Sequence, residues 1–112
     1  MSKIRDDVIV VEGSGNVFSD LGLPNAEELL AKAQLASAIS DIIEERALTQ
    51  GEAARVLGTT QPKVSNLVRG RFEGFSLERL ARFLNTLDRD VEIRVRPRPQ
   101  SRRKARIRVT VA

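Results

Sequence analysis

The stretch TQGEAARVLGTTQPKVSNLVRG, residues 49–70, holds two short helical patterns with a glycine between them. The first pattern, residues 50–57, begins with a capping box, because the Thr49 hydroxyl can accept a hydrogen bond from the Glu52 amide while the Glu52 carboxylate reaches back. Gly58 ends this helix, since glycine adopts the positive φ of a helix terminus without strain. We therefore expect the second helix to begin within a few residues of Gly58.

The second helix is predicted to begin at Thr60 and to end at Gly70. Pro62 falls in its first turn, where a missing N–H leaves no helical hydrogen bond unmade. Apolar residues recur three and four positions apart, which predicts one buried stripe. That stripe consists of Val64, Leu67 and Val68. Ala54 in the first helix is small enough to let the two helices cross closely, so the pair is typical of a helix-turn-helix.

The polar residues of the second helix are left pointing outward or sideways. Gln and Asn amides can bond N6 and N7 of adenine, and Lys can reach O6 and N7 of guanine. This helix also has no acid in its first turn. No negative side chain there would repel a phosphate that approaches the positive N-terminus of the helix. We therefore predict that it contacts base edges of duplex DNA; the alternative is an ordinary exposed polar face. The candidate residues are Gln61, Lys63, Ser65 and Asn66.

Residues 48–70 resemble the helix-turn-helix of the lambda repressor/Cro (XRE) family. The matching positions are Gln50, Ala54, Gly58, Gln61, Val64, Leu67 and Gly70. The resemblance implies a mainly α, lambda-repressor-like DNA-binding domain of four to five helices. It further implies that the bases face Gln61, Pro62, Lys63, Ser65 and Asn66. Gln50 would support Gln61 and contact a phosphate. Further phosphate contacts are expected from Thr60 and from Arg69 and Arg71, which follow the helix; the alternative for the two arginines is a solvated position without a partner.

Two further helices are predicted around this motif. One begins after Asn25, which forms a capping-box-like arrangement with Glu28, and runs to about Arg46. The other is capped by Ser76 and runs over residues 77–87 with a regular apolar stripe. Together with the motif, these two helices form the expected helical domain.

Beyond the last helix the apolar period changes from that of a helix to that of a strand. Val91, Ile93 and Val95 alternate with charged residues, which predicts a half-buried strand, and a second, shorter alternation covers residues 107–111. We therefore expect three parts in the chain. These are an N-terminal arm over residues 1–24, with a possible short strand at 9–11, a helix-turn-helix domain over 25–90, and a short C-terminal β element with a basic tail over 91–112.

Charge is distributed unevenly along the 112 residues. Residues 1–92 carry 11 Lys and Arg and all 15 acids, whereas residues 93–112 carry eight Lys and Arg and no acid. Within the main body, residues 53–72 contain four basic residues and no acid. A local basic face of this kind suits a polyanionic partner. The basic tail either follows the DNA backbone or enters the minor groove, or it is a solvated tail without a partner.

Composition argues against several other classes of protein. There is no Cys and no His, so disulfides, thiolate or imidazole metal sites and His-assisted nucleophiles are excluded. No enzyme activity, metal or cofactor is therefore expected. Neither a signal peptide nor a membrane-spanning stretch is present, and the absence of Cys fits a cytoplasmic protein.

Two features predict partners other than DNA. The predicted strand at residues 91–96 would have an unpaired edge. A second copy of the chain could cover this edge, and a dimer also suits a palindromic operator. The alternative is a hairpin with residues 106–111 of the same chain. We therefore expect a homodimeric transcriptional repressor.

The layout, with FSDLG at residues 18–22 before a long helix, is also similar to HigA-type antitoxins. This likeness implies an alternative, in which residues 1–24 or the first helix neutralise a toxin and the DNA site autoregulates the operon. The Arg-rich end after Pro97 is no part of that pattern.

Overall fold

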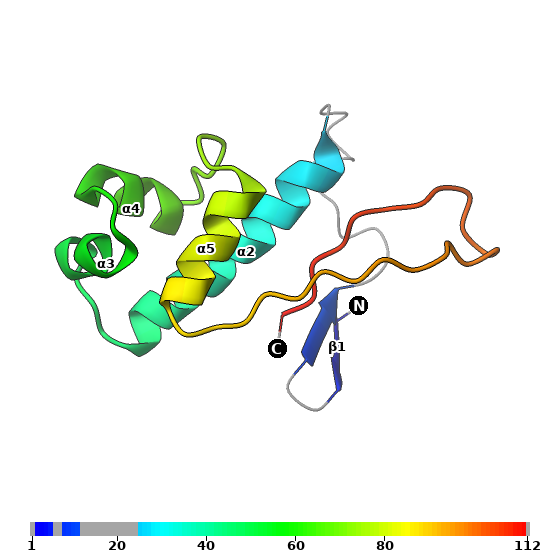
Figure 1. Ribbon diagram of the computed structural model, residues 1–112, viewed down its shortest axis with the longest axis horizontal. Coiled ribbons are helices and arrows are strands. Elements are labelled where there is room, and N and C mark those ends of the chain that lie inside the picture. The colour runs from blue at the N-terminus through cyan, green and yellow to red at the C-terminus, as the bar shows by residue number, and fades with distance from the viewer. Residues whose placement is uncertain (1, 6–7, 12–24, 112) are drawn as a thin grey trace.

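The computed structural model describes residues 2–5, 8–11 and 25–111. A long helix crosses the molecule with the last helix packed along it, and two short helices lie together at one end (Figure 1). The elements are the strands β1 (Ser2–Arg5) and β2 (Val8–Val11), and the helices α2 (Ala26–Glu45), α3 (Gln50–Leu57), α4 (Gln61–Val68) and α5 (Leu77–Thr86). The described residues therefore contain four helices, which agrees with the predicted mainly α domain.

One apolar core joins the four described helices. Ile39 of α2, Val64 of α4 and Leu80 of α5 are completely buried, and all three belong to the same cluster of contacting side chains. Burial of such side chains contributes about 1.5–3 kcal/mol each to folding. The ends of the long helices are also tied together, because the Arg46 guanidinium donates a 2.7 Å hydrogen bond to the Leu87 carbonyl oxygen. The core therefore fixes α3 and α4 relative to the long helices.

Three of the four helix starts use a hydroxyl cap, as the sequence predicts. The capping box of α3 is complete: the Glu52 amide donates to Thr49 Oγ1 at 3.1 Å, and the Thr49 amide donates to Glu52 Oε1 at 2.9 Å. Ser76 Oγ likewise accepts from the Arg79 amide at 3.1 Å. The prediction for Asn25 is wrong. This residue has a left-handed backbone (φ 60°) and makes no side-chain cap, because a capping side chain reaches the helix amides only from an extended backbone.

The capping box makes the stability of the protein depend on pH. The hydrogen bond from the Thr49 backbone amide lowers the pKa of the Glu52 carboxyl below its usual value of 4.5. A lowered folded-state pKa means that ionised Glu52 stabilises the fold above about pH 4.5, and that this contribution is lost as the pH falls through the folded value. We expect Glu52→Gln to be less stable than the parent at pH 7 and to approach it at pH 3, measured by urea unfolding. Glu73→Gln, at an exposed loop position, is the control, and an unchanged gap at pH 3 would contradict the prediction.

All four helices of the described residues end in the same way. A residue with a left-handed backbone follows the last turn, and the next amide donates back across it over 2.8–3.0 Å, as in a Schellman motif. The left-handed residues are Ala47, Gly58, Gly70 and Asp88. Gly58 and Gly70 therefore end α3 and α4 as predicted, whereas α2 and α5 end at residues that carry a side chain.

Ala47 is the position where this ending is strained. Its φ is 53°, and a left-handed backbone costs an L-residue about 1–2 kcal/mol. Glycine avoids that cost but loses about 0.4–1 kcal/mol through the greater freedom of the unfolded chain. We expect Ala47→Gly to raise the free energy of unfolding by about 0.5–1 kcal/mol, measured by urea denaturation. Ala38→Gly in the middle of α2 is the control and should destabilise; a loss of stability in both variants would show that Ala47 is not strained.

The predicted C-terminal β element is not formed. Residues 91–99 have neither helix nor strand, and the side chains of Ile93 and Val95 are 87% and 95% exposed instead of half-buried. A strand needs neighbouring amides and carbonyls to pair with, and no strand is paired with residues 91–98 within the described part of this chain. Residues 107–111 likewise contain only a single β-bridge, at Val111.

The sheet that the structure does describe is the antiparallel hairpin of β1 and β2, in which Ser2 pairs with Val11. Residues 12–24 of the predicted arm lie outside the described residues.

Candidate nucleic-acid interface

The helices α3 and α4 form the helix-turn-helix predicted over residues 49–70. Ala54 of α3 is 6% exposed, and Val64 and Leu67 of α4 are 0% and 2% exposed. Between the helices Gly58 has a φ of 69°, a conformation that glycine adopts without strain. α4 also packs against α2. The helix α4 is therefore held by one buried edge, and the rest of its surface is free.

The predicted base-contacting residues lie on the free surface of α4. Ser65 is half-buried, and the other four are exposed. Those four are Gln61, Pro62, Lys63 and Asn66. Val68, which we assigned to the inner stripe, is 36% exposed at the end of the helix. None of the predicted contact residues is needed to fill the core, so each can approach a ligand.

The N-terminus of α4 differs in charge from the starts of the other described helices. The helices α2, α3 and α5 each carry an acid in the first turn, whereas α4 carries none. Its cap is a long one, because Thr60 Oγ1 accepts from the Lys63 amide at 3.4 Å. The partial positive charge of the helix end is therefore not offset. Such an end suits a phosphate or another anion.

Gln61 lies beside the start of α3. Its Oε1 atom is 3.7 Å from the place where a Cβ on Gly51 would stand. Because Gly51 has no side chain, the Gln61 side-chain amide lies close to the α3 backbone with nothing between them. Gln50, to which the resemblance assigned the support of Gln61, is half-buried in the preceding position. The two short helices therefore meet at their N-terminal ends through Gln61.

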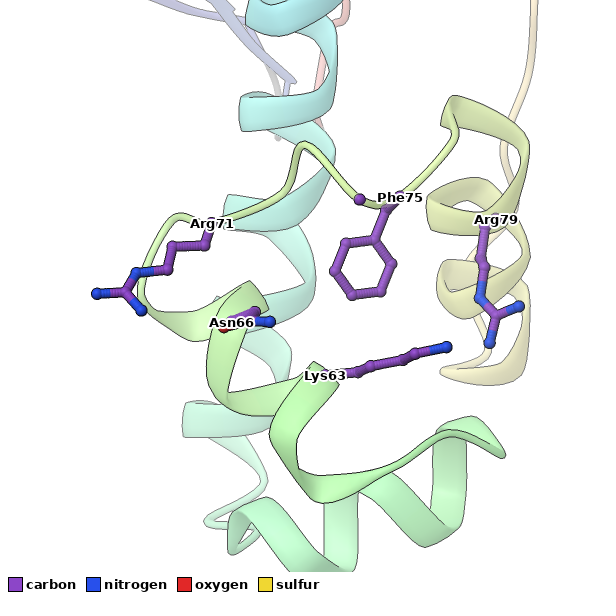
Figure 2. Close-up of a pocket in the computed structure, with 6 residues that line it drawn as sticks. Lys63, Asn66, Arg71, Phe75 and Arg79 are labelled. Carbon is purple, nitrogen blue, oxygen red and sulfur yellow. The ribbon is translucent and has the colours of Figure 1, made fainter.

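A shallow pocket opens between α4 and α5. Its lining consists of Lys63, Asn66, Arg71, Gly74, Phe75 and Arg79. Lys63 and Arg79 extend toward one another from the two helices, with the Phe75 ring above the Lys63 side chain, whereas Arg71 points away on the other side (Figure 2). No acid lines the pocket. Two of the residues predicted on α4 and one predicted phosphate ligand are therefore brought together, while Arg69 lies outside this lining.

Arg79 is the residue that the sequence analysis missed. Its guanidinium carbon lies 5.4 Å from the centre of the Phe83 ring, within the range of a cation–π contact. Phe83 in turn packs edge-on against Phe75, with ring centres 6.0 Å apart. This stack orients Arg79 beside α4. The available signal was its place three residues after the Ser76 cap, in the first turn of the helix that follows the motif.

The cations of this surface have no acidic partner within the described ranges. The three salt bridges found there join Lys32 to Glu28, Arg82 to Glu78 and Arg94 to Glu92. The described residues include no group of three His, Cys, Asp or Glu side chains that could hold a metal ion. They also include no helix with the length and hydropathy needed to cross a lipid bilayer. The surface is therefore a cationic one built on a helix-turn-helix.

Comparisons with known proteins agree with this geometry. A family model described as a helix-turn-helix domain matches residues 17–96. A solved structure described as an XRE family transcriptional regulator is 50% identical, with a TM-score of 0.75; the match covers 80% of this chain and 100% of that one. The comparison with curated proteins found no match. The extent of the family match and the identity to the solved structure show that the chain belongs to the XRE family of helix-turn-helix proteins.

Proposed function

We propose that the protein binds a specific sequence of duplex DNA as a homodimer and represses transcription from the promoter that it occupies. The family and the solved relative support DNA binding and regulation of transcription, and such regulators are typically not enzymes. The observation that carries sequence specificity is the free polar surface of α4, from which Gln61, Lys63 and Asn66 extend without any role in the core. Repression then needs only occupancy, because a bound protein excludes the polymerase.

The size and chemistry of α4 suit the major groove. Its eight residues make a rod about 12 Å long at about 1.5 Å per residue, comparable with the groove width of about 12 Å. Gln61 and Asn66 each offer an amide for adenine, and Lys63 offers an ammonium for guanine. Ser65 adds a hydroxyl and Pro62 an apolar surface suited to a thymine methyl group. We assign these five side chains to the reading of base edges.

Phosphate contacts are proposed on both sides of this helix. Gln50 and Thr60 lie at the N-terminal ends of α3 and α4, and Arg69 and Arg71 follow α4. Arg79, held by the Phe83 ring, adds a further cation across the shallow pocket from Lys63. Guanidinium groups bind phosphate oxygens in pairs of parallel hydrogen bonds. Contacts of this type fix the register of a protein on the duplex but carry no sequence information.

The proposed homodimer rests on the segment that follows α5. Ile93 and Val95 are almost fully exposed, and exposed apolar side chains beside unpaired backbone favour association with another chain. Two copies related by a two-fold axis would also present two α4 helices to a palindromic operator.

A second candidate function is that of an antitoxin, as the likeness to HigA-type proteins suggests. In favour of it, the hairpin of β1 and β2 forms no part of the helix-turn-helix and offers further surface to a protein partner. A toxin-like reading frame beside the gene, and neutralisation of its product on co-expression, would support this function. DNA binding would then serve autoregulation, so the two candidates are compatible.

The proposed function is tested by selecting bound fragments from genomic DNA and footprinting the preferred sequence. We expect a palindrome whose half-sites lie about 34 Å apart, one helical turn, and a dimer in sedimentation experiments. Recovery of fragments without any common sequence would contradict specific reading by α4. A footprint over one short asymmetric site, together with a monomer in sedimentation, would contradict the dimer alone.

A further inference from the structure

The C-terminal segment holds the densest positive charge of the chain. Eight of the 19 Lys and Arg residues, and no acid, fall within residues 93–112. The only salt bridge found in this segment of the described structure joins Arg94 to Glu92. The family match ends at residue 96, so the function of the helix-turn-helix does not account for the cations that follow.

A turn after Pro97 gathers these cations. The Arg102 amide donates to the Pro99 carbonyl oxygen at 3.1 Å, and the Arg98 guanidinium donates to the same oxygen at 3.2 Å. The Arg102 guanidinium donates to the Lys104 carbonyl oxygen, also at 3.2 Å. These bonds fold the chain back, as the orange-to-red loop in Figure 1 shows. They use carbonyl oxygens, and the one carboxylate that contacts this segment in the described structure, Glu27, accepts from the Ile107 amide at 3.2 Å without forming a salt bridge to an arginine.

Arginines from both sides of the turn come close enough to repel one another. The pKa of Arg102 is lowered by desolvation first, and then by the positive charges of four neighbouring arginines. Those neighbours are Arg96, Arg98, Arg106 and Arg108. A cluster of like charges with no salt bridge to an acid is unfavourable by itself, and a polyanion relieves the repulsion. We call residues 96–108 the arginine turn.

The arginine turn lies far from the recognition helix. The molecule is 46 Å along its longest axis, with α3 and α4 at one end and the arginine turn at the other (Figure 1). The helices α2 and α5 lie between these two ends of the molecule. The arginine turn is therefore separated from the surface proposed to bind the operator.

The composition of the arginine turn favours the phosphate backbone of a nucleic acid over an acidic protein. Residues 97–106 contain four arginines and one lysine but no large apolar or aromatic side chain. Protein interfaces depend on such apolar anchors, and base stacking needs aromatic rings. Guanidinium groups alone suit phosphates, which they bind without regard to sequence.

We propose that the arginine turn is a second, sequence-independent site for the phosphate backbone of nucleic acid, at the opposite end of the molecule from α4. With α4 on its operator, which rests on the proposed function above, the protein would hold two duplex segments at once. The second site itself does not depend on α4.

The test compares two double variants of the full chain with the same loss of charge. Arg102→Gln with Arg106→Gln removes two cations of the arginine turn, and Arg82→Gln with Arg89→Gln removes two from α5 and the residues after it. The probe is a 24-bp duplex of scrambled sequence, followed by fluorescence anisotropy between about 50 and 200 mM KCl. Each lost phosphate contact should reduce the slope of log affinity against log salt by about 0.9. We expect a reduction of about 1.8 for the first pair and no change for the second, with circular dichroism showing that both fold.

Two further measurements separate this proposal from the function of α4. Energy transfer between two labelled duplexes in the presence of the protein should fall when the arginine turn is changed. The variant Gln61→Ala should retain the parent salt slope on scrambled DNA, even if no operator is found. A salt slope that is the same in both double variants would overturn the second site. Binding of polyglutamate with an unchanged slope on DNA would overturn it in favour of an acidic protein partner.

Discussion

Replacing Leu67 by alanine is expected to lower the free energy of unfolding by about 2–5 kcal/mol, the range found when a buried leucine leaves a cavity. Leu67 is 2% exposed and belongs to the core cluster that joins α4 to the long helices. It is also one of only two buried residues in α4. The loss would be a large share of the roughly 5–15 kcal/mol that stabilises a domain of this size. Urea unfolding followed by circular dichroism measures it directly.

The neighbouring residue supplies the control for Leu67. Val68 is 36% exposed, so Val68→Ala removes methyl groups from the same helix without opening a comparable cavity. We expect a change of about 0.5 kcal/mol or less, as for most surface substitutions. If both variants lost the same free energy, α4 would not be anchored through Leu67, and the orientation assigned to its polar face would be wrong.

Replacing Gln61 by alanine is expected to cost about 1–3 kcal/mol of binding free energy at one operator position, and to relax the preference for the base at that position. This corresponds to about a 5- to 150-fold weaker affinity for the operator, since about 1.4 kcal/mol is a factor of ten. Gln61 is exposed and contributes nothing to the core, so the free energy of unfolding should stay within about 0.5 kcal/mol of the parent. Competition binding on operators substituted at each position measures the effect.

Random DNA distinguishes base reading from a general loss of affinity. Gln61→Ala should bind a scrambled duplex as the parent does, because phosphate contacts supply nearly all of non-specific binding. Arg82→Gln, on the exposed side of α5, serves as the control and should change neither measurement. An equal loss for Gln61→Ala on operator and scrambled DNA would mean that Gln61 does not read a base.

The parts of the fold that were predictable are those fixed by neighbours in the sequence. The helix α3 begins and ends where the Thr49 capping box and Gly58 predicted. The cap of α5 at Ser76 depends on one hydroxyl and an amide three residues later. Such an interaction can be predicted from neighbouring residues without knowledge of the rest of the fold. The exposed positions of α4 followed in the same way, because two buried residues at helical spacing determine which side faces the core.

The parts that failed depend on residues far away in the sequence. The alternation at Val91, Ile93 and Val95 shows that a strand is possible, but forming it needs hydrogen bonds to a partner strand, and no such pairing is found in the described chain. The place of Arg79 depends on the rings of Phe75 and Phe83 and on the angle between α4 and α5. The angle between α4 and α5 cannot be predicted from a local sequence pattern. The shallow pocket was therefore not predicted, although half of the residues that line it were.

The narrow attachment of α4 also has a consequence for how such proteins diverge. Only Val64 and Leu67 anchor the helix, and Thr60 and Gly70 lie at its two ends. Substitutions at the remaining positions can therefore accumulate without weakening the scaffold. A new set of exposed side chains grafted between the same anchors would redirect the protein to another operator, and a duplicated gene could acquire a separate regulon by few mutations.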